Sequence, residues 1–358
     1  MTACSCVLRW ILIALAGAPA IGWAAVFTVV NTNDSGAGSL RQAILDANMT
    51  PGFDEIHFNI AGGGVQTIGV TSALPGINDP VLIDGYTQPG SAANTAGIGT
   101  NAQIRIEVQR AATFTGGSFI FLVGSGGSTI RGLAVNSFYA AQIAVTAGSA
   151  DCVVAGNFIG TDATGTIGYP GEPGTRVGLE VGGDRCRIGG TARADRNLVS
   201  GLSNTGIHVG GDDVVVQGNL VGTDASGGNA IGVVDGIVIG AAGFGASPSG
   251  VVIGGAGGGN VISGNSGNGI LVESGENHSI LTNLIGLAAF PLATIPNEGA
   301  GILVRDGSLS TIGSQVAGNA NAIAGNLGPG VLIGGSPSPT PQGWFVVGNA
   351  IFGNGGLP

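Results

Sequence analysis

A four-residue motif that returns about every thirty residues restricts this chain to a small number of folds. Each copy begins with Gly, continues with an apolar residue and ends with Val or Ile, and successive copies start 28 to 33 residues apart. Fixed-period similarity of this length is typical of solenoids and other repeat arrays. The β-branched residue that closes each copy favours a short strand. The copies begin at Gly178, Gly206, Gly236, Gly269, Gly301 and Gly330.

An Asn followed by two apolar residues recurs with the same overall period, at intervals that are alternately short and long. We expect these side chains to stack at a sharp corner of the chain, where each amide bonds to the neighbouring backbone. A ligand-binding role for them is the alternative. The positions are Asn157, Asn197, Asn219, Asn260, Asn283, Asn321 and Asn349.

A third apolar segment lies between the two landmarks, as at residues 214–216 and 251–253. Three short strands per period, separated by turns of variable length, predict an all-β chain: a right-handed parallel β-helix, which is a single-stranded solenoid with three strands per rung. The composition agrees, because 71 residues are Gly and only 9% are charged, whereas ordinary chains carry about 25% charged residues. About ten rungs would form a rod about 50 Å long.

The N-terminus predicts export. Arg9 precedes a mostly apolar stretch at residues 10–21, and small-residue cleavage patterns follow. We therefore expect residues 1–24 to be a signal peptide and the mature chain to be secreted or held at the cell surface, without a membrane span. An uncleaved N-terminal anchor is the alternative. Cys152 and Cys186 remain after cleavage, and export permits a disulfide, but sequence alone does not bring the two sulfurs together.

Residues 25–62 differ from the repeat and predict an N-terminal cap made of a strand, a short amphipathic helix and a strand. Ser39 and Gln42 have the capping-box spacing, and the apolar residues from Leu40 to Ala47 share one helical face. Residues 63–358 form the predicted β-helix. Because the sequence stops inside a rung, we expect it to be a fragment or to be followed by a further module.

Three segments resemble one group of proteins. Residues 31–44 (NTNDSGAGSLRQAI) and 51–58 (PGFDEIHF) are similar to the N-terminal segment of bacterial surface β-helix proteins of the CSLREA type, although Gly38 and Gln42 depart from that string. Residues 83–90 (IDGYTQPG) and 157–165 (NFIGTDATG) are also similar to such proteins. The resemblance implies a pectin-lyase-like β-helix at the cell surface and implies no particular activity.

The densest group of charged residues falls on two consecutive repeats. Glu180 and His208 both take the third motif position, so we expect them to point outward about 4.8 Å apart. Asp212 and Asp213 follow His208 in the next turn. Paired carboxylates beside a His can perform acid–base chemistry on a glycan, so these four residues are the catalytic candidates. Asp184, Arg185 and Arg187 follow Glu180 and are the ligand-binding candidates.

Two other interpretations of this patch stay open. The carboxylates can hold Ca²⁺ through oxygen ligands, or the group can be a solvated, salt-bridged surface. Gly211-Asp212-Asp213 is similar to a signature of polygalacturonases, but alignment of the repeats sets Asp213 on Asp151 and Asn277, an ordinary turn position. We predict no other cofactor, and three His without ligand spacing argue against zinc.

The net charge of the chain limits the classes of partner that it can bind. The chain has a net charge of −10 and no Lys, which disfavours nucleic acid and anionic membranes. We expect a glycan-contacting or adhesin-like surface protein whose partner is an extracellular polysaccharide or another cell surface. The alternatives are a polysaccharide lyase or glycoside hydrolase, and a stalk for a further C-terminal module.

Overall fold

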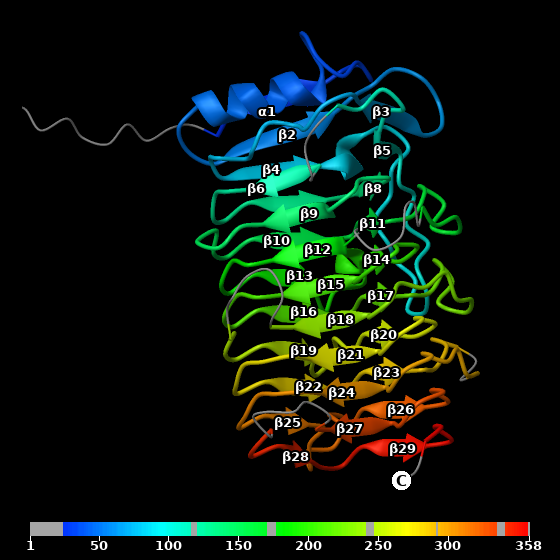
Figure 1. The fold of residues 1–358 in the computed structure, drawn as a ribbon. Coiled ribbons are helices and arrows are strands. Elements are labelled where there is room, and N and C mark those ends of the chain that lie inside the picture. Colours follow the sequence, from blue (N-terminus) through cyan, green and yellow to red (C-terminus); the bar gives the residue numbers. More distant parts are fainter. Residues whose placement is uncertain are drawn as a thin grey trace, which may run out of the picture.

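Three parallel sheets run along the molecule, and from Phe121 onward each turn of the chain adds one strand to each sheet (Figure 1). This computed structural model describes residues 24–115, 120–169, 177–240, 247–290, 293–334 and 341–356. The predicted right-handed parallel β-helix is confirmed. Most of the predicted signal peptide and Pro358 lie outside the described residues. No helix in the described part of the chain is long and apolar enough to cross a bilayer.

Sheet A contains the strand that comes next in the chain after each motif strand, and it has eleven strands in the described chain. These are β1 (Val26–Val29), β2 (Asp54–Phe58), β4 (Val81–Asp84), β7 (Thr129–Arg131), β10 (Val153–Ala155), β13 (Arg187–Gly189), β16 (Val215–Gln217), β19 (Val252–Gly254), β22 (Ser279–Leu281), β25 (Thr311–Ile312) and β28 (Phe345–Val346).

Sheet B contains the apolar pairs that follow the recurring Asn, and it has ten strands in the described residues. These are β3 (Gln66–Val70), β5 (Ile106–Arg110), β8 (Leu133–Asn136), β11 (Phe158–Ile159), β14 (Leu198–Val199), β17 (Leu220–Val221), β20 (Val261–Ile262), β23 (Leu284–Ile285), β26 (Ala322–Ala324) and β29 (Ala350–Phe352).

Sheet C contains the motif strands and has eight strands in the same part of the chain. These are β6 (Phe121–Val123), β9 (Ala141–Val145), β12 (Val177–Val181), β15 (Ile207–Val209), β18 (Ile237–Ile239), β21 (Ile270–Val272), β24 (Ile302–Val304) and β27 (Val331–Ile333).

The core is one continuous column of aliphatic side chains inside the three sheets. In sheet A, for example, Ile188 pairs with Val216, Val216 with Ile253, and Ile253 with Ile280, and all four are fully buried. Each such side chain contributes about 1.5–3 kcal/mol through burial. Because each rung packs its apolar side chains against the rungs on either side, a single rung is unstable and a stack is stable.

The predicted capping helix is present as α1 (Leu40–Met49), and its apolar face covers the first rung (Figure 1). The Ser39 hydroxyl accepts a hydrogen bond from the Gln42 N–H at 3.2 Å, but the Gln42 side chain bonds Asp46 instead of returning to Ser39. Only half of the predicted capping box therefore forms. The Arg41 guanidinium joins the helix to the next rung by donating to the Ala73 carbonyl.

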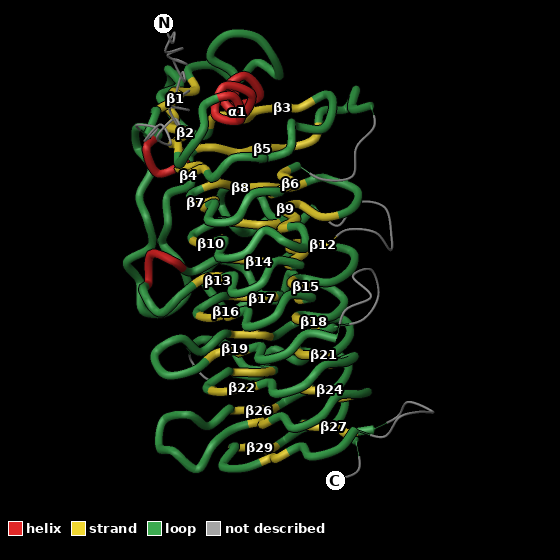
Figure 2. The backbone as a smooth tube through the Cα atoms, turned by 90° about the vertical axis from the view of Figure 1, so that its left-hand side faces the viewer, coloured by secondary structure: helices red, strands yellow, loops and turns green. Residues whose placement is uncertain are grey.

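One long excursion leaves the stack between β4 and β5, after the short 3-10 helix η1 (Gly85–Thr87), and descends beside the later rungs (Figure 2). It ends against the second 3-10 helix, η2 (Arg193–Asp195), where the Asn94 amide donates to the Arg193 carbonyl. The Arg196 guanidinium donates to carbonyl oxygens of the excursion, including that of Gly97 at 3.3 Å. The excursion therefore ties together rungs that lie far apart in sequence.

Candidate functional site

Glu180 and His208 lie side by side on the outer face of sheet C. The register of β12 and β15 pairs Glu180 with His208, while the flanking aliphatic residues turn inward and are fully buried. The same position holds Ala144 in β9 and Val238 in β18. Strand alternation, which buries the neighbours of each residue, directs these two polar side chains outward. The motif alignment predicts this stacked pair, and the register agrees with it.

A groove of about 480 Å³ lies over the pair. Asn204 and Thr205 line one side of it, and Asp235 and Glu273 contribute two further carboxylates from later rungs. The floor is formed by apolar side chains of the sheet such as Val238. The sequence prediction did not include Asp235 or Glu273, because they stand at different distances from their own motif glycines.

The carboxyl group of Glu180 is partly removed from water by its place in the groove. Burial raises the pKa of Glu180, and the neighbouring His208 opposes that rise. A carboxyl group of this kind holds its proton to a higher pH than an exposed Glu does. It is therefore suited to donate a hydrogen bond or a proton to a bound ligand.

The imidazole of His208 is fixed in orientation. It is 7% exposed, and its Nε2 lies 3.0 Å from the carbonyl oxygen of Gly240. Since a carbonyl oxygen only accepts, Nε2 carries the hydrogen.

The two additional carboxylates are held by their own partners. Asp235 Oδ1 accepts hydrogen bonds from the backbone N–H and side-chain amide of Asn268, at 2.7 and 2.9 Å. Glu273 forms an ion pair with Arg305, whose Nη1 lies 2.5 Å from Oε1. The groove itself is therefore acidic, with hydrogen-bonding groups around an aliphatic floor. Its described lining includes no Arg, Phe, Tyr or Trp side chain.

Asp184, Arg185, Asp212 and Asp213 lie elsewhere, in the turns between sheet C and sheet A, and none of them lines this groove. Arg185 and Asp213 both have left-handed backbones, with φ of 53° and 55°. Each N–H at this position donates to the carbonyl one rung further on, as from Asp213 to Ser249 at 2.8 Å. Asp151 and Asn277 take the same conformation, which agrees with the alignment of Asp213 to a turn position.

The side chains of these turns also bond to one another. Arg185 forms an exposed ion pair with Asp151 at 2.8 Å. The Asp184 carboxylate accepts from the Asp212 N–H, and the Asp212 carboxylate accepts from the Ser249 N–H, at 3.0 and 2.8 Å. These contacts match the solvated, salt-bridged interpretation.

Arg187 lies on a different sheet from Glu180. It is the first residue of β13 in sheet A, and its Nη1 forms an ion pair with Asp195 at 2.8 Å. The seven residues proposed from sequence as one patch therefore occupy three places. These are the groove, the turns between sheet C and sheet A, and the outer face of sheet A.

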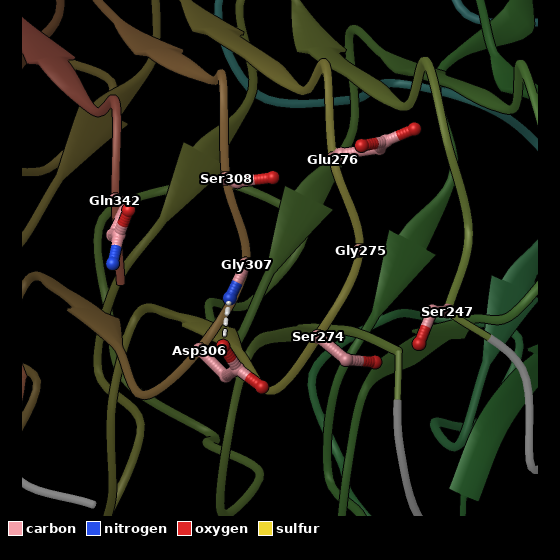
Figure 3. Close-up of a pocket in the computed structure, with 8 residues that line it drawn as sticks. All are labelled: Ser247, Ser274, Gly275, Glu276, Asp306, Gly307, Ser308 and Gln342. Atoms are coloured by element: carbon pink, nitrogen blue, oxygen red, sulfur yellow. Dashed lines mark hydrogen bonds between the residues drawn. The ribbon is translucent and has the colours of Figure 1, made fainter. Parts of the chain in front are cut away.

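A second cavity, of about 460 Å³, lies over the turns that follow β21 and β24. Figure 3 shows Glu276 and Asp306 on neighbouring turns, with Ser274 and Ser308 beside them and glycine backbone between them. The Asp306 carboxylate accepts a hydrogen bond from the Gly307 N–H at 2.6 Å. The described residues contain no group of three or more His, Cys, Asp or Glu side chains that could hold a metal ion.

The recurring Asn side chains form a buried hydrogen-bonded ladder. In each step an amide nitrogen donates to the amide oxygen one rung on, as from Asn219 to Asn260 at 3.0 Å and from Asn260 to Asn283 at 2.9 Å. The ladder continues to Asn349. Its bonds are all made within the stack, which matches a structural role.

Sequence reasoning missed a second ladder, at the turn that leads into sheet C. Asn265, Asn297, Asn326 and Asn354 donate in sequence at 2.8 Å in each step. Each of these Asn is followed two residues later by Gly, at intervals of 28 to 32 residues. That pattern was available in the sequence.

Comparison with known proteins assigns no family to this chain. A scan against protein-family models gives no match, and neither does a search of curated proteins. Among solved structures, the Dettilon tailspike protein (gp208) is 13% identical with a TM-score of 0.49; the alignment covers 92% of this chain and 62% of the tailspike, so this chain spans less than two thirds of it.

Two other solved structures are enzymes by their descriptions. The periplasmic alginate epimerase AlgG is 12% identical with a TM-score of 0.46, over 85% of this chain and 74% of that one. Pectate lyase Pel9A is 12% identical with a TM-score of 0.39, over 94% and 80%.

Proposed function

We propose that this chain is an exported β-helix that contacts an extracellular polysaccharide through the groove over Glu180 and His208. The observation that carries the proposal is the convergence of Glu180, His208, Asp235 and Glu273 in one cavity of about 480 Å³. Such grooves, with a few placed polar groups over an apolar floor, are the usual form of a ligand site.

The charge of the groove selects among polysaccharides. Glu180, Asp235 and Glu273 line it, in the described chain only Glu273 of these three is paired with an arginine, and the whole chain has a net charge of −10. A polyuronate carries one negative charge per sugar and would be repelled. Uncharged sugars present hydroxyl groups. These can donate hydrogen bonds to the carboxyl oxygens of Asp235 and Glu180, and they can accept one from Glu180 when its carboxyl group is protonated. We therefore propose a neutral polysaccharide as the partner.

A panel of soluble polysaccharides tests this, with uncharged glucans, xylans and mannans in one set and polyuronates in the other. Affinity electrophoresis of the full chain is expected to show retardation by at least one uncharged polysaccharide. The variant Glu180→Gln/His208→Gln is expected to lose about thirtyfold in affinity, the equivalent of two neutral hydrogen bonds of about 1 kcal/mol each. Equal binding by the variant, or retardation by polyuronates alone, would refute the proposal.

Glu298→Gln is the matched control. Glu298 is exposed and does not line the groove, so the change removes one negative charge without touching the site. Its affinity is expected to equal that of the unmodified chain. A similar loss in this control would mean that net charge, and not the groove, determines binding.

Hydrolysis of the same polysaccharide is the second candidate function. It is favoured by one observation, the raised pKa of Glu180 beside a fixed imidazole, which is the environment of a general acid. Release of reducing ends that stops in Glu180→Gln would establish an enzyme, and binding without release would support the contact role. Release of unsaturated ends from a polyuronate would indicate a lyase instead and would contradict the neutral partner.

Export is part of the proposal and has its own test. The full sequence, expressed with residues 1–24 in place, is expected to yield a secreted or surface-held chain that begins near Ala25. N-terminal sequencing of that product checks the cleavage position. A product that stays inside the cell with Met1 intact would contradict export.

A further inference from the structure

Cys152 and Cys186 occupy the same inward position in two consecutive rungs. Each is the first residue after a left-handed turn residue, and each directly precedes a strand of sheet A, β10 and β13 respectively. The register that pairs Val153 with Arg187 extends back to them, and the Arg187 N–H donates to the Cys152 carbonyl at 2.8 Å. In-register residues on neighbouring parallel strands lie about 4.8 Å apart, within the Cα range that a disulfide accepts.

The two side chains also meet inside the core. Cys152 Sγ lies 3.3 Å from the Ser149 carbonyl oxygen, and Cys186 Sγ lies 3.5 Å from the same atom. Both residues are buried, at 2% and 0% exposure, and both are free thiols in this structure. A hydrogen bond from the Cys186 thiol lowers the pKa of Cys152, and the same bond raises the pKa of Cys186.

Other rungs show that the fold does not require a thiol at this position. The equivalent residue, directly after the left-handed turn, is a hydroxyl-bearing or aliphatic side chain in most of the other rungs. These residues are Ser128, Val214, Val251 and Ser310, and all are buried. Two thiols in adjacent rungs are therefore a feature of this pair, which the groove and its ligand do not explain.

We propose that Cys152 and Cys186 form a disulfide that closes one rung of the β-helix into a covalent ring. The ring contains β10, β11 and β12, and so it includes Glu180. A disulfide restricts the unfolded chain to conformations in which its ends meet. It would therefore hold the register of this rung even when the hydrogen bonds of the sheet open. The inference is independent of the ligand proposed for the groove.

The oxidant is a disulfide donor, either a thiol–disulfide oxidoreductase of the exporting compartment or oxidised glutathione. One Cys thiolate attacks the donor disulfide to form a mixed disulfide and releases one donor thiol. The second Cys thiolate attacks the sulfur of the first, which forms the Cys152–Cys186 bond and releases the other donor thiol. Two thiol protons and two electrons pass to the donor. Because both sulfurs are buried, the reaction takes place before this rung is fully packed.

Peptide mapping tests the proposal directly. The full chain, with Cys4→Ser and Cys6→Ser to leave one pair, is unfolded under reducing conditions and refolded with oxidised and reduced glutathione. Trypsin cuts after Arg185 and Arg187, so Cys186 leaves as a dipeptide, and Cys152 leaves in the peptide of residues 132–176. A product in which the two are joined, two hydrogens lighter than their sum, is expected. Two freely alkylated cysteines after refolding would overturn the proposal.

The variant Cys152→Val/Cys186→Val separates the bond from the packing. Val fills the same position in the next two rungs, so this variant is expected to keep the core. Reduction of the oxidised chain is expected to lower Tm by about 5 °C, while the Val variant shows no change with reductant. An equal response in both proteins would show that the linkage does not hold the rung.

Discussion

Replacement of Asn260 by Ala removes a central step of the first Asn ladder. The Asn260 side chain is fully buried and makes four hydrogen bonds. Its oxygen accepts from the backbone N–H and the side-chain amide of Asn219, both at 3.0 Å. Its amide nitrogen donates to the Val216 carbonyl and to Asn283 Oδ1, both at 2.9 Å. The change also leaves the buried Asn219 N–H without an acceptor.

The expected cost is about 4 kcal/mol, because each lost bond is worth about 1 kcal/mol and an orphaned buried donor is among the more expensive losses. Asn349→Ala is the matched control. Asn349 also makes four side-chain hydrogen bonds, but it is half-buried. Water can replace its bonds, so we expect a cost of about 1 kcal/mol.

Equilibrium unfolding in guanidinium, followed by far-ultraviolet circular dichroism, measures both costs. An unchanged slope of free energy against denaturant shows that the folded and unfolded states remain comparable. If Asn260→Ala costs no more than Asn349→Ala, the reasoning is refuted, because burial of the ladder would then add nothing to its hydrogen bonds.

Three further predictions concern single positions. Burial lowers the pKa of His278 below 6.5, and its Nδ1 is buried with no hydrogen-bond partner in the described chain. The unfolded state therefore binds the proton more readily, stability falls as pH drops through about 6.5, and urea titrations at two pH values should show that His278→Ser removes this loss. Burial raises the pKa of Glu180 above 4.5, so its ionisation opposes folding as pH rises, and Glu180→Gln is expected to raise Tm at neutral pH but not below pH 4.5; an equal rise at both would contradict this cause. A Cβ on Gly254, at φ +87°, would lie 1.9 Å from the Leu281 carbonyl oxygen, whereas one on Gly257, at φ +74°, meets open space. Gly254→Ala should therefore lower Tm well beyond the effect of Gly257→Ala, which carries only a backbone cost of about 1–2 kcal/mol.

The architecture could be predicted from the sequence because the same short sequence pattern recurs in successive rungs of a solenoid. The motif period places equivalent residues over one another, so the pairing of Glu180 with His208 follows from counting alone. The alignment of Asp213 with Asp151 and Asn277 likewise predicted a shared turn position, and in the structure all three have left-handed backbones. Each of these statements needs only the register between adjacent rungs.

The residues that line the groove could not be predicted from the sequence in the same way. Asp235 and Glu273 enter it from rungs whose turns differ in length, and their positions relative to the motif differ from that of Glu180. The turn after β12 moves Asp184 and Arg185 to a corner, and the strand that follows carries Arg187 to a different sheet. Closeness in sequence to Glu180 therefore misled the prediction of one seven-residue patch.

Sequence alone thus determined which residues stack along the axis of this protein, since residues one period apart lie over one another in adjacent rungs. Only the tertiary structure decided which residues meet around the circumference, because that depends on the path of each turn. The same division applies to Cys152 and Cys186: their spacing is that of one rung, but their shared contact with Ser149 inside the core became visible only in three dimensions.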